Sequence, residues 1–218
     1  KQPLRMTDIA DNHFSIGQLA WKHQQVYPIT ITGQRADGLF GWNLFDGKIV
    51  ELNYDENRMT IYNQMPKLDK SYEGFSIEYM KHHFCISLDV EIEGKRNKGR
   101  FLFDTGFQKA LIFDQKLFEK QHVPVKELKL IKASIVKNSS NKEIPLNTVN
   151  TPKIYLGKYF LTQVPSDLNN YNKPAGYDTH FIGSDILKRF NILLDFQKNM
   201  VYLKPNTHFN DAYFDAKS

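Results

Sequence analysis

The chain has 218 residues, a net charge of +5 and a hydrophobic share of 41%, which together predict a globular protein of one domain or two small ones. Its 16 phenylalanines and 11 tyrosines exceed what a disordered chain carries. The single cysteine, Cys85, excludes an internal disulfide framework and a zinc site built on several thiolates. No apolar run approaches the roughly 18 residues of a membrane helix, so we expect no membrane span.

The basic residues are scattered along the chain, whereas a nucleic-acid binder gathers them in a patch with aromatic residues between them. The densest basic group, residues 95–100, follows Glu91 and Glu93 and is expected to form the solvated turn of a hairpin. We therefore expect no nucleic-acid partner. Cys85 lies in an alternating apolar stretch, which predicts a buried structural thiol.

The first clear pattern spans residues 39–62. An apolar pair and Gly41 precede a short helix expected at 42–48, and two alternating strands follow at 50–54 and 59–62, joined by a polar turn. Alternation with period two is typical of half-buried strands, and the polar triplet between them supplies the turn.

The middle of the chain predicts further strands and one catalytic candidate. The expected elements are, in order, a polar linker at 65–75, strands at 75–80, 84–92 and 100–103, the tripeptide Asp104-Thr105-Gly106, a hairpin at 133–149 and an irregular loop at 165–179. The tripeptide follows a strand of alternating bulk, so we expect a tight turn that presents a carboxylate. On these residues alone, the alternative is a turn in which Asp104 caps its own backbone amides.

Residues 181–203 repeat the pattern of residues 39–61 at a constant spacing of 142 residues, which aligns Gly183 with Gly41 and Asn199 with Asn57. The second copy predicts a helix at 184–190 and strands at 192–196 and 201–203. We infer an internal repeat. The predicted organisation is the second half of a first lobe at 1–64, the linker at 65–75, a complete lobe at 76–206 and a tail at 207–218.

This order of features resembles the clan of pepsin-like and retropepsin-like aspartic proteases. A lobe of that clan places Asp-Thr-Gly after an apolar strand, then a flap hairpin, then an apolar-apolar-Gly motif and a short helix, as in Phe181-Ile182-Gly183 here. The resemblance covers 76–206 and, in part, 14–64. It implies an all-β fold of acid-protease-like closed β-barrel lobes, with short helices after the apolar-apolar-Gly motifs.

The resemblance also implies a function, the hydrolysis of peptide bonds in a peptide or protein substrate. Asp104 would be one half of a dyad in which two carboxyl groups roughly 3 Å apart share a proton. Thr105 would lock the two catalytic loops through its hydroxyl, and Gly106 would allow the tight turn. Phe107 and the flap tip would contact the substrate. The predicted flap tip consists of Asn138, Ser139, Ser140 and Asn141. No cofactor and no metal are implied.

Two departures from the clan bear on catalysis. No second Asp-Thr-Gly or Asp-Ser-Gly is present, so the other aspartate would come from an upstream segment that completes the first lobe or from a homodimer partner. This chain alone is expected to be inactive. Phe107 stands where active members usually have Ala or Ser, and its ring would either crowd the cleft or point into the core.

Other readings stay open beside the peptidase. One is a catalytically inactive domain of the same fold that binds extended peptides by strand addition, and another is a structural all-β module. Adjacent His82 and His83 on one strand point to opposite faces and do not suit a single metal ion. Asp185 and Asp195 are expected to be structural. Analogy with secreted members of the clan suggests a secreted, periplasmic or cell-envelope location.

Overall fold

The structure is a computed structural model that describes residues 11–26, 38–137, 143–170 and 176–216. It divides into two compact units, Lys1–Leu44 and Phe45–Ser218. In the first unit, strands β1 (Asp11–Ile16) and β2 (Leu19–Gln25) form an antiparallel hairpin. Gly17 turns it with a φ of +58°, a conformation that glycine adopts without steric cost. The predicted helix at 42–48 is shorter than expected, a 3₁₀ turn η2 at Trp42–Phe45.

The larger sheet of the second unit carries the predicted catalytic strand. Its strands are β6 (Glu78–Met80), β7 (His83–Ile92), β8 (Lys95–Phe103), β9 (Leu111–Asp114), β10 (Leu130–Lys137), β11 (Glu143–Leu156), β12 (Tyr159–Asn169) and β13 (His180–Ile182). They lie in the order β10-β11-β12-β9-β13-β8-β7-β6. An additional pairing of β11 with β7 closes six of them into a barrel. Both the all-β class and the closed barrel are therefore confirmed.

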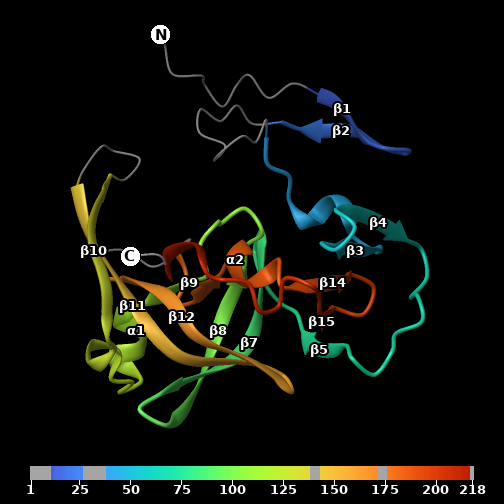
Figure 1. Cartoon of the computed structure of the whole chain (residues 1–218). Coiled ribbons are helices and arrows are strands. Elements are labelled where there is room, and N and C mark those ends of the chain that lie inside the picture. Colours follow the sequence, from blue (N-terminus) through green and yellow to red (C-terminus); the bar gives the residue numbers. More distant parts are fainter. Residues whose placement is uncertain (1–10, 27–37, 138–142, 171–175, 217–218) are drawn as a thin grey trace, which may run out of the picture. The chain divides into compact units, whose positions relative to one another are not determined.

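The other sheet has the order β4-β3-β14-β15-β5 (Figure 1). Its strands are β3 (Ile49–Asn53), β4 (Arg58–Tyr62), β5 (Glu73–Ser76), β14 (Phe190–Asp195) and β15 (Met200–Pro205). The described helical segments of this unit are short. They are α1 (Gln115–Lys120), η3 (Val125–Glu127), α2 (Ser184–Leu187) and η5 (Phe214–Ala216). The α2 helix directly follows Gly183, as the apolar-apolar-Gly motif predicts.

The two segments matched by the predicted repeat adopt the same hairpin. Asn57 and Asn199 both have positive φ, at 50° and 55°. In each turn the side chain four residues earlier accepts a backbone hydrogen bond, Asn53 from Glu56 at 3.1 Å and Asp195 from Lys198 at 3.0 Å. Such Asx turns fix a polar hairpin end.

Several predicted boundaries are wrong. The expected irregular loop at 165–179 begins as strand, because β12 continues to Asn169. Its polar residues are buried with partners: Ser166 bonds Thr151 at 2.6 Å, and Asp167 accepts from Thr148 at 2.6 Å. The basic group at 95–100 lies within β8, since the turn before it is made by Glu93 and Gly94, both with positive φ. The expected strand at 75–80 is divided between β5 and β6, which belong to different sheets.

The predicted lobe boundaries stay a prediction. Residues 73–76 of the expected linker form β5, which pairs with β15. Residues 45–64 belong to the same compact unit as residues 76–206.

Candidate functional site

Asp104 stands at the carboxyl end of β8, where two parallel strands end together. β13 pairs with β8 in parallel and places Ile182 beside Phe103. The backbone N–H of Asp104 donates to the carbonyl of Ile182 at 3.1 Å. The loop that carries Asp104 and the Gly183 turn therefore leave the sheet at the same edge.

The two oxygens of the Asp104 carboxylate differ in environment. Oδ1 accepts hydrogen bonds from the backbone N–H of Gly106 at 2.9 Å and of Phe107 at 3.1 Å. Among the described residues, no donor bonds Oδ2, and the residue is half-buried. The self-capping turn considered from the sequence is thus what Oδ1 does. Because capping uses one oxygen, the other is left for water or for a second carboxyl group.

Thr105 and Gly106 are exposed, whereas Phe107 is half-buried. The Phe107 ring lies edge-on to Phe181, with centroids 6.2 Å apart. Of the two positions considered for this ring, the structure shows packing against Phe181 of β13. Contact of Phe107 with a substrate stays a prediction.

Close packing of this loop explains the glycine in the apolar-apolar-Gly motif. A Cβ at Gly183 would lie 2.2 Å from the Lys109 carbonyl oxygen and 2.4 Å from a Phe107 ring carbon. The backbone N–H of Ser184 donates to the Phe107 carbonyl at 2.6 Å, and that of Gly183 donates to Ala110 at 2.9 Å. Any side chain at position 183 would push the loop carrying Asp104 off the start of α2.

A partly buried charge cluster behind the loop was missed by the sequence reasoning. Lys109 Nζ lies 2.8 Å from Asp167 Oδ2 and 3.4 Å from Asp215 Oδ2. Burial disfavours the charged lysine, but the hydrogen bonds and charges of Asp167 and Asp215 together outweigh it and leave the pKa of Lys109 raised. The cluster ties the loop that follows Asp104 to β12 and to the C-terminal residues. No periodicity or motif marks it.

The C-terminal residues of the predicted tail pack on α2 through two buried charged side chains. Asp185 accepts a hydrogen bond from the backbone of Phe214 at 2.9 Å and pairs with Lys188 at 2.6 Å. Arg189 donates to the carbonyl of Asp211 at 2.6 Å, and its guanidinium lies 4.1 Å from the centre of the Tyr213 ring. The structural role expected for Asp185 is confirmed.

His180 was also missed as a notable residue. It is fully buried among aromatic rings, and its Nδ1 accepts a hydrogen bond from the Asp114 backbone at 3.1 Å. The nearest ring is that of Phe118, 4.1 Å away between centroids. Burial lowers the pKa of His180 to about 3, so this imidazole is neutral at neutral pH.

The predicted flap corresponds to the hairpin β10–β11. The four flap-tip residues, Asn138, Ser139, Ser140 and Asn141, lie outside the described residues. The arm β10 carries two exposed apolar side chains, Leu130 at 53% and Ile135 at 68% exposure. A hollow of about 420 Å³ lies between β12 and the C-terminal residues, and the Asp104 loop is not part of its lining.

The part of the chain that the structure describes contains no group of three His, Cys, Asp or Glu side chains placed to hold a metal ion. It also contains no helix long and apolar enough to cross a bilayer. Cys85 is fully buried, as predicted, and burial raises the pKa of its thiol.

Comparison with known proteins gives a structural likeness alone. No protein-family model matches the chain, and no curated protein matches it. Among solved structures, a retropepsin-like aspartic protease from Rickettsia conorii matches with a TM-score of 0.43 and 18% identity, over 65% of this chain and 97% of that one. A likeness at this level assigns neither an activity nor a site to this chain.

Proposed function

We propose that the protein takes part in aspartic-peptidase-like hydrolysis, with Asp104 as one member of a carboxyl dyad. The other member would come from an upstream segment of the polypeptide or from a second chain. The observation that carries the proposal is the asymmetry of the Asp104 carboxylate, whose Oδ1 is held by two backbone amides while no described donor bonds Oδ2.

The chemistry needs that asymmetry. Two carboxyl groups about 3 Å apart share one proton and titrate as a pair. The ionised member takes a proton from water as the water oxygen attacks the peptide carbonyl carbon. The protonated member donates to the carbonyl oxygen as it becomes negative. A carboxylate whose orientation is fixed through one oxygen can present the other to this proton exchange.

The surroundings of Asp104 support a partner loop. Thr105 and Gly106 are exposed, so a second loop can approach them. The loop packs against Gly183 and is tied to β12 by the Lys109 cluster. A partner loop can therefore approach without changing its conformation. A rigid support of this kind is what a catalytic carboxylate requires.

The test is proteolysis of an unfolded protein at acid and neutral pH, with and without a statine-type inhibitor. It is carried out on residues 1–218 and on the longest natural polypeptide that contains them. We expect Asp104→Asn to lower the activity of the active form about 100- to 10,000-fold. Asp46→Asn is the matched control, because Asp46 is an exposed carboxylate of the same compact unit. Activity that survives Asp104→Asn would refute the proposal.

A second candidate function is peptide binding by strand addition without catalysis. The observation that favours it is the position of β10 at one end of the larger sheet, with exposed Leu130 and Ile135. An extended peptide could pair with this edge. Peptide binding that persists in Asp104→Asn and is abolished by a proline in β10, with no cleavage by any form, would favour this candidate.

A further inference from the structure

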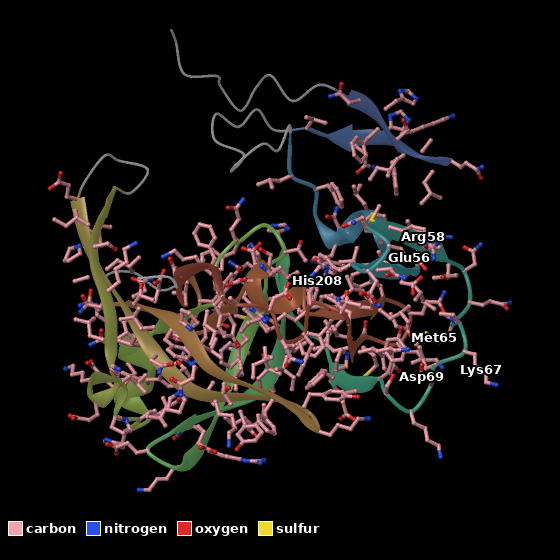
Figure 2. All side chains as sticks on the ribbon, viewed as in Figure 1. Glu56, Arg58, Met65, Lys67, Asp69 and His208 are labelled. Carbon is pink, nitrogen blue, oxygen red and sulfur yellow. The ribbon has the colours of Figure 1, made fainter. Side chains whose placement is uncertain are left out.

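The two edges of the smaller sheet differ in what covers them. At one edge, β5 pairs antiparallel with β15, placing Phe75 beside Val201. At the other edge stands β4, and in the part of the chain that the structure describes no strand pairs with its outer side. Open edges are commonly protected by charge or by covering segments. Two exposed charged residues at the start of this edge, Glu56 and Arg58, pair with each other at 2.7 Å (Figure 2).

The registers of this sheet follow a local twofold axis. Val50 pairs with Leu194, and Leu52 pairs with Ile192. Under the 142-residue spacing of the predicted repeat, Val50 corresponds to Ile192 and Leu52 to Leu194, so each pair maps onto the other. The hairpins also agree: Val50 pairs with Ile61 as Ile192 pairs with Leu203. The axis passes between Glu51 and Leu193.

This axis gives β5 an expected counterpart. β4 corresponds to β15, so a strand equivalent to β5 would pair with the outer edge of β4. By the repeat spacing, that strand would precede residue 1 of the sequence.

The side chains on one face of the β3–β4 hairpin are also less covered than their counterparts on β14–β15. Leu194, Phe196 and Val201 are 8%, 4% and 0% exposed. The Phe196 ring is covered by Phe84 of β7, 6.0 Å away between centroids. Their counterparts Leu52, Tyr54 and Met59 are half-exposed and line an open hollow of about 260 Å³. Within the described residues of the unit Phe45–Ser218, no strand covers in the first copy the surface that β7 covers in the second copy.

We propose that the outer edge of β4 and the hollow beside it form the docking surface for an upstream lobe of the same polypeptide, which adds a β5-like strand and a β7-like strand. A second copy of this chain fits less well, because its own β5 is already paired with β15. The proposal goes beyond the peptidase function and uses neither Asp104 nor its loop.

The surface also constrains the docking strand. A Cβ at Gly74 would lie 3.2 Å from the Tyr202 ring, so β5 needs a small residue there. The counterpart of Tyr202 is Thr60, which is smaller. The upstream strand can therefore carry a side chain where β5 has glycine.

The test compares amide hydrogen exchange in residues 58–62 between residues 1–218 and the longest natural polypeptide that contains them. We expect exchange to slow at least about tenfold in the longer form, because unpaired edge amides become hydrogen-bonded. Exchange in β15, which is paired on both sides, should be the same in both. Equal exchange of β4 in both forms, or a gene that encodes no upstream lobe, would overturn the proposal.

A matched pair of variants keeps the test independent of folding. Met59→Asp should leave the unfolding midpoint of residues 1–218 nearly unchanged and should abolish the extra protection of β4 in the longer form. Val201→Asp, at the buried counterpart, should unfold both forms. If protection of β4 instead rises with concentration in residues 1–218 alone, the occupant is a second copy and the proposal is wrong.

The outcomes separate this inference from the peptidase proposal. Protection of β4 in a longer form that has no Asp104-dependent proteolysis would support the docking surface and refute the enzyme. Asp104-dependent proteolysis with unprotected β4 would do the reverse.

Discussion

The hairpins β3–β4 and β14–β15 share their register, their turn hydrogen bonds and their left-handed asparagine. Their burial differs, since Leu203 is fully buried while its counterpart Ile61 is half-exposed. The local pattern of alternation and turn residues therefore specifies the hairpin by itself. The burial of the hairpin side chains depends on the segments that pack on the hairpin, and those segments are distant in sequence.

The largest effect is expected at the glycine before each short helix. Gly183→Ala would force a Cβ against backbone at 2.2 Å, whereas a Cβ at Gly41 meets only the flexible end of the Asn43 side chain at 2.6 Å. We expect Gly183→Ala to cost about 3 kcal/mol and Gly41→Ala under about 0.5 kcal/mol. Both tryptophans lie in the first unit, so urea unfolding is followed by tryptophan fluorescence for Gly41→Ala and by far-UV circular dichroism for Gly183→Ala. An equal loss of stability in the two variants would show that the two glycines are not packed differently.

Core truncation should separate the two hairpins next. Leu203→Ala removes a fully buried side chain and should cost about 3 kcal/mol, because a cavity remains. Ile61→Ala at the half-exposed counterpart should cost about 1 kcal/mol. Urea unfolding midpoints measure both. If an upstream lobe covers β4, the cost of Ile61→Ala should rise in the longer polypeptide, while that of Leu203→Ala stays the same.

Acid should destabilise the second unit through His180, whose counterpart in the first copy is Gly38. Its pKa is lowered from 6.5 to about 3 in the folded state, so below pH 6.5 the unfolded chain binds a proton that the folded chain does not. The free energy of unfolding is therefore unaffected by His180 above pH 6.5. It falls as the pH is lowered toward 3, by about 1.4 kcal/mol per pH unit, or about 2 kcal/mol by pH 5.

The check is the urea midpoint of the wild type and of His180→Asn between pH 7 and pH 5. Asn retains an acceptor for the Asp114 amide and does not titrate. The variant should have a flatter pH dependence, and parallel curves would show that His180 does not set it.

The smallest effect should be equal in the two hairpins. Asn57 and Asn199 hold φ of 50° and 55°, which costs most other residues about 1 kcal/mol. Asn57→Ala and Asn199→Ala should therefore each destabilise by about 1 kcal/mol, measured by urea unfolding. The Gly variants at both positions should lie within about 0.5 kcal/mol of the wild type. A large difference between the two alanine variants would mean that the turns are not equivalent.

Local rules predicted the hairpins, the helix after Gly183 and the turn that presents Asp104. They depend on neighbouring residues, and the sequence displays them directly. The end of β12 was missed because Ser166 and Asp167 are polar, and their buried partners Thr151 and Thr148 come from another strand. Hydropathy cannot reveal polar groups that are satisfied across a sheet.

The candidate site was predictable in part for the same reason. The turn made by Asp104, Thr105 and Gly106 is local, and its two hydrogen bonds run from the amides of Gly106 and Phe107 to the Asp104 carboxylate. The support beneath it is not local, since Lys109 meets Asp167 from β12 and Asp215 from the C-terminal residues. Parallel pairing of β13 with β8, which brings Gly183 to Asp104, also joins distant segments.

Cys85 is the one thiol of the whole chain. It is fully buried on β7, the strand whose pairing with β11 closes the barrel. A thiol-reactive dye can reach it only when that strand opens. The labelling rate of the wild-type protein thus measures how often the barrel opens locally, and no engineered cysteine is needed.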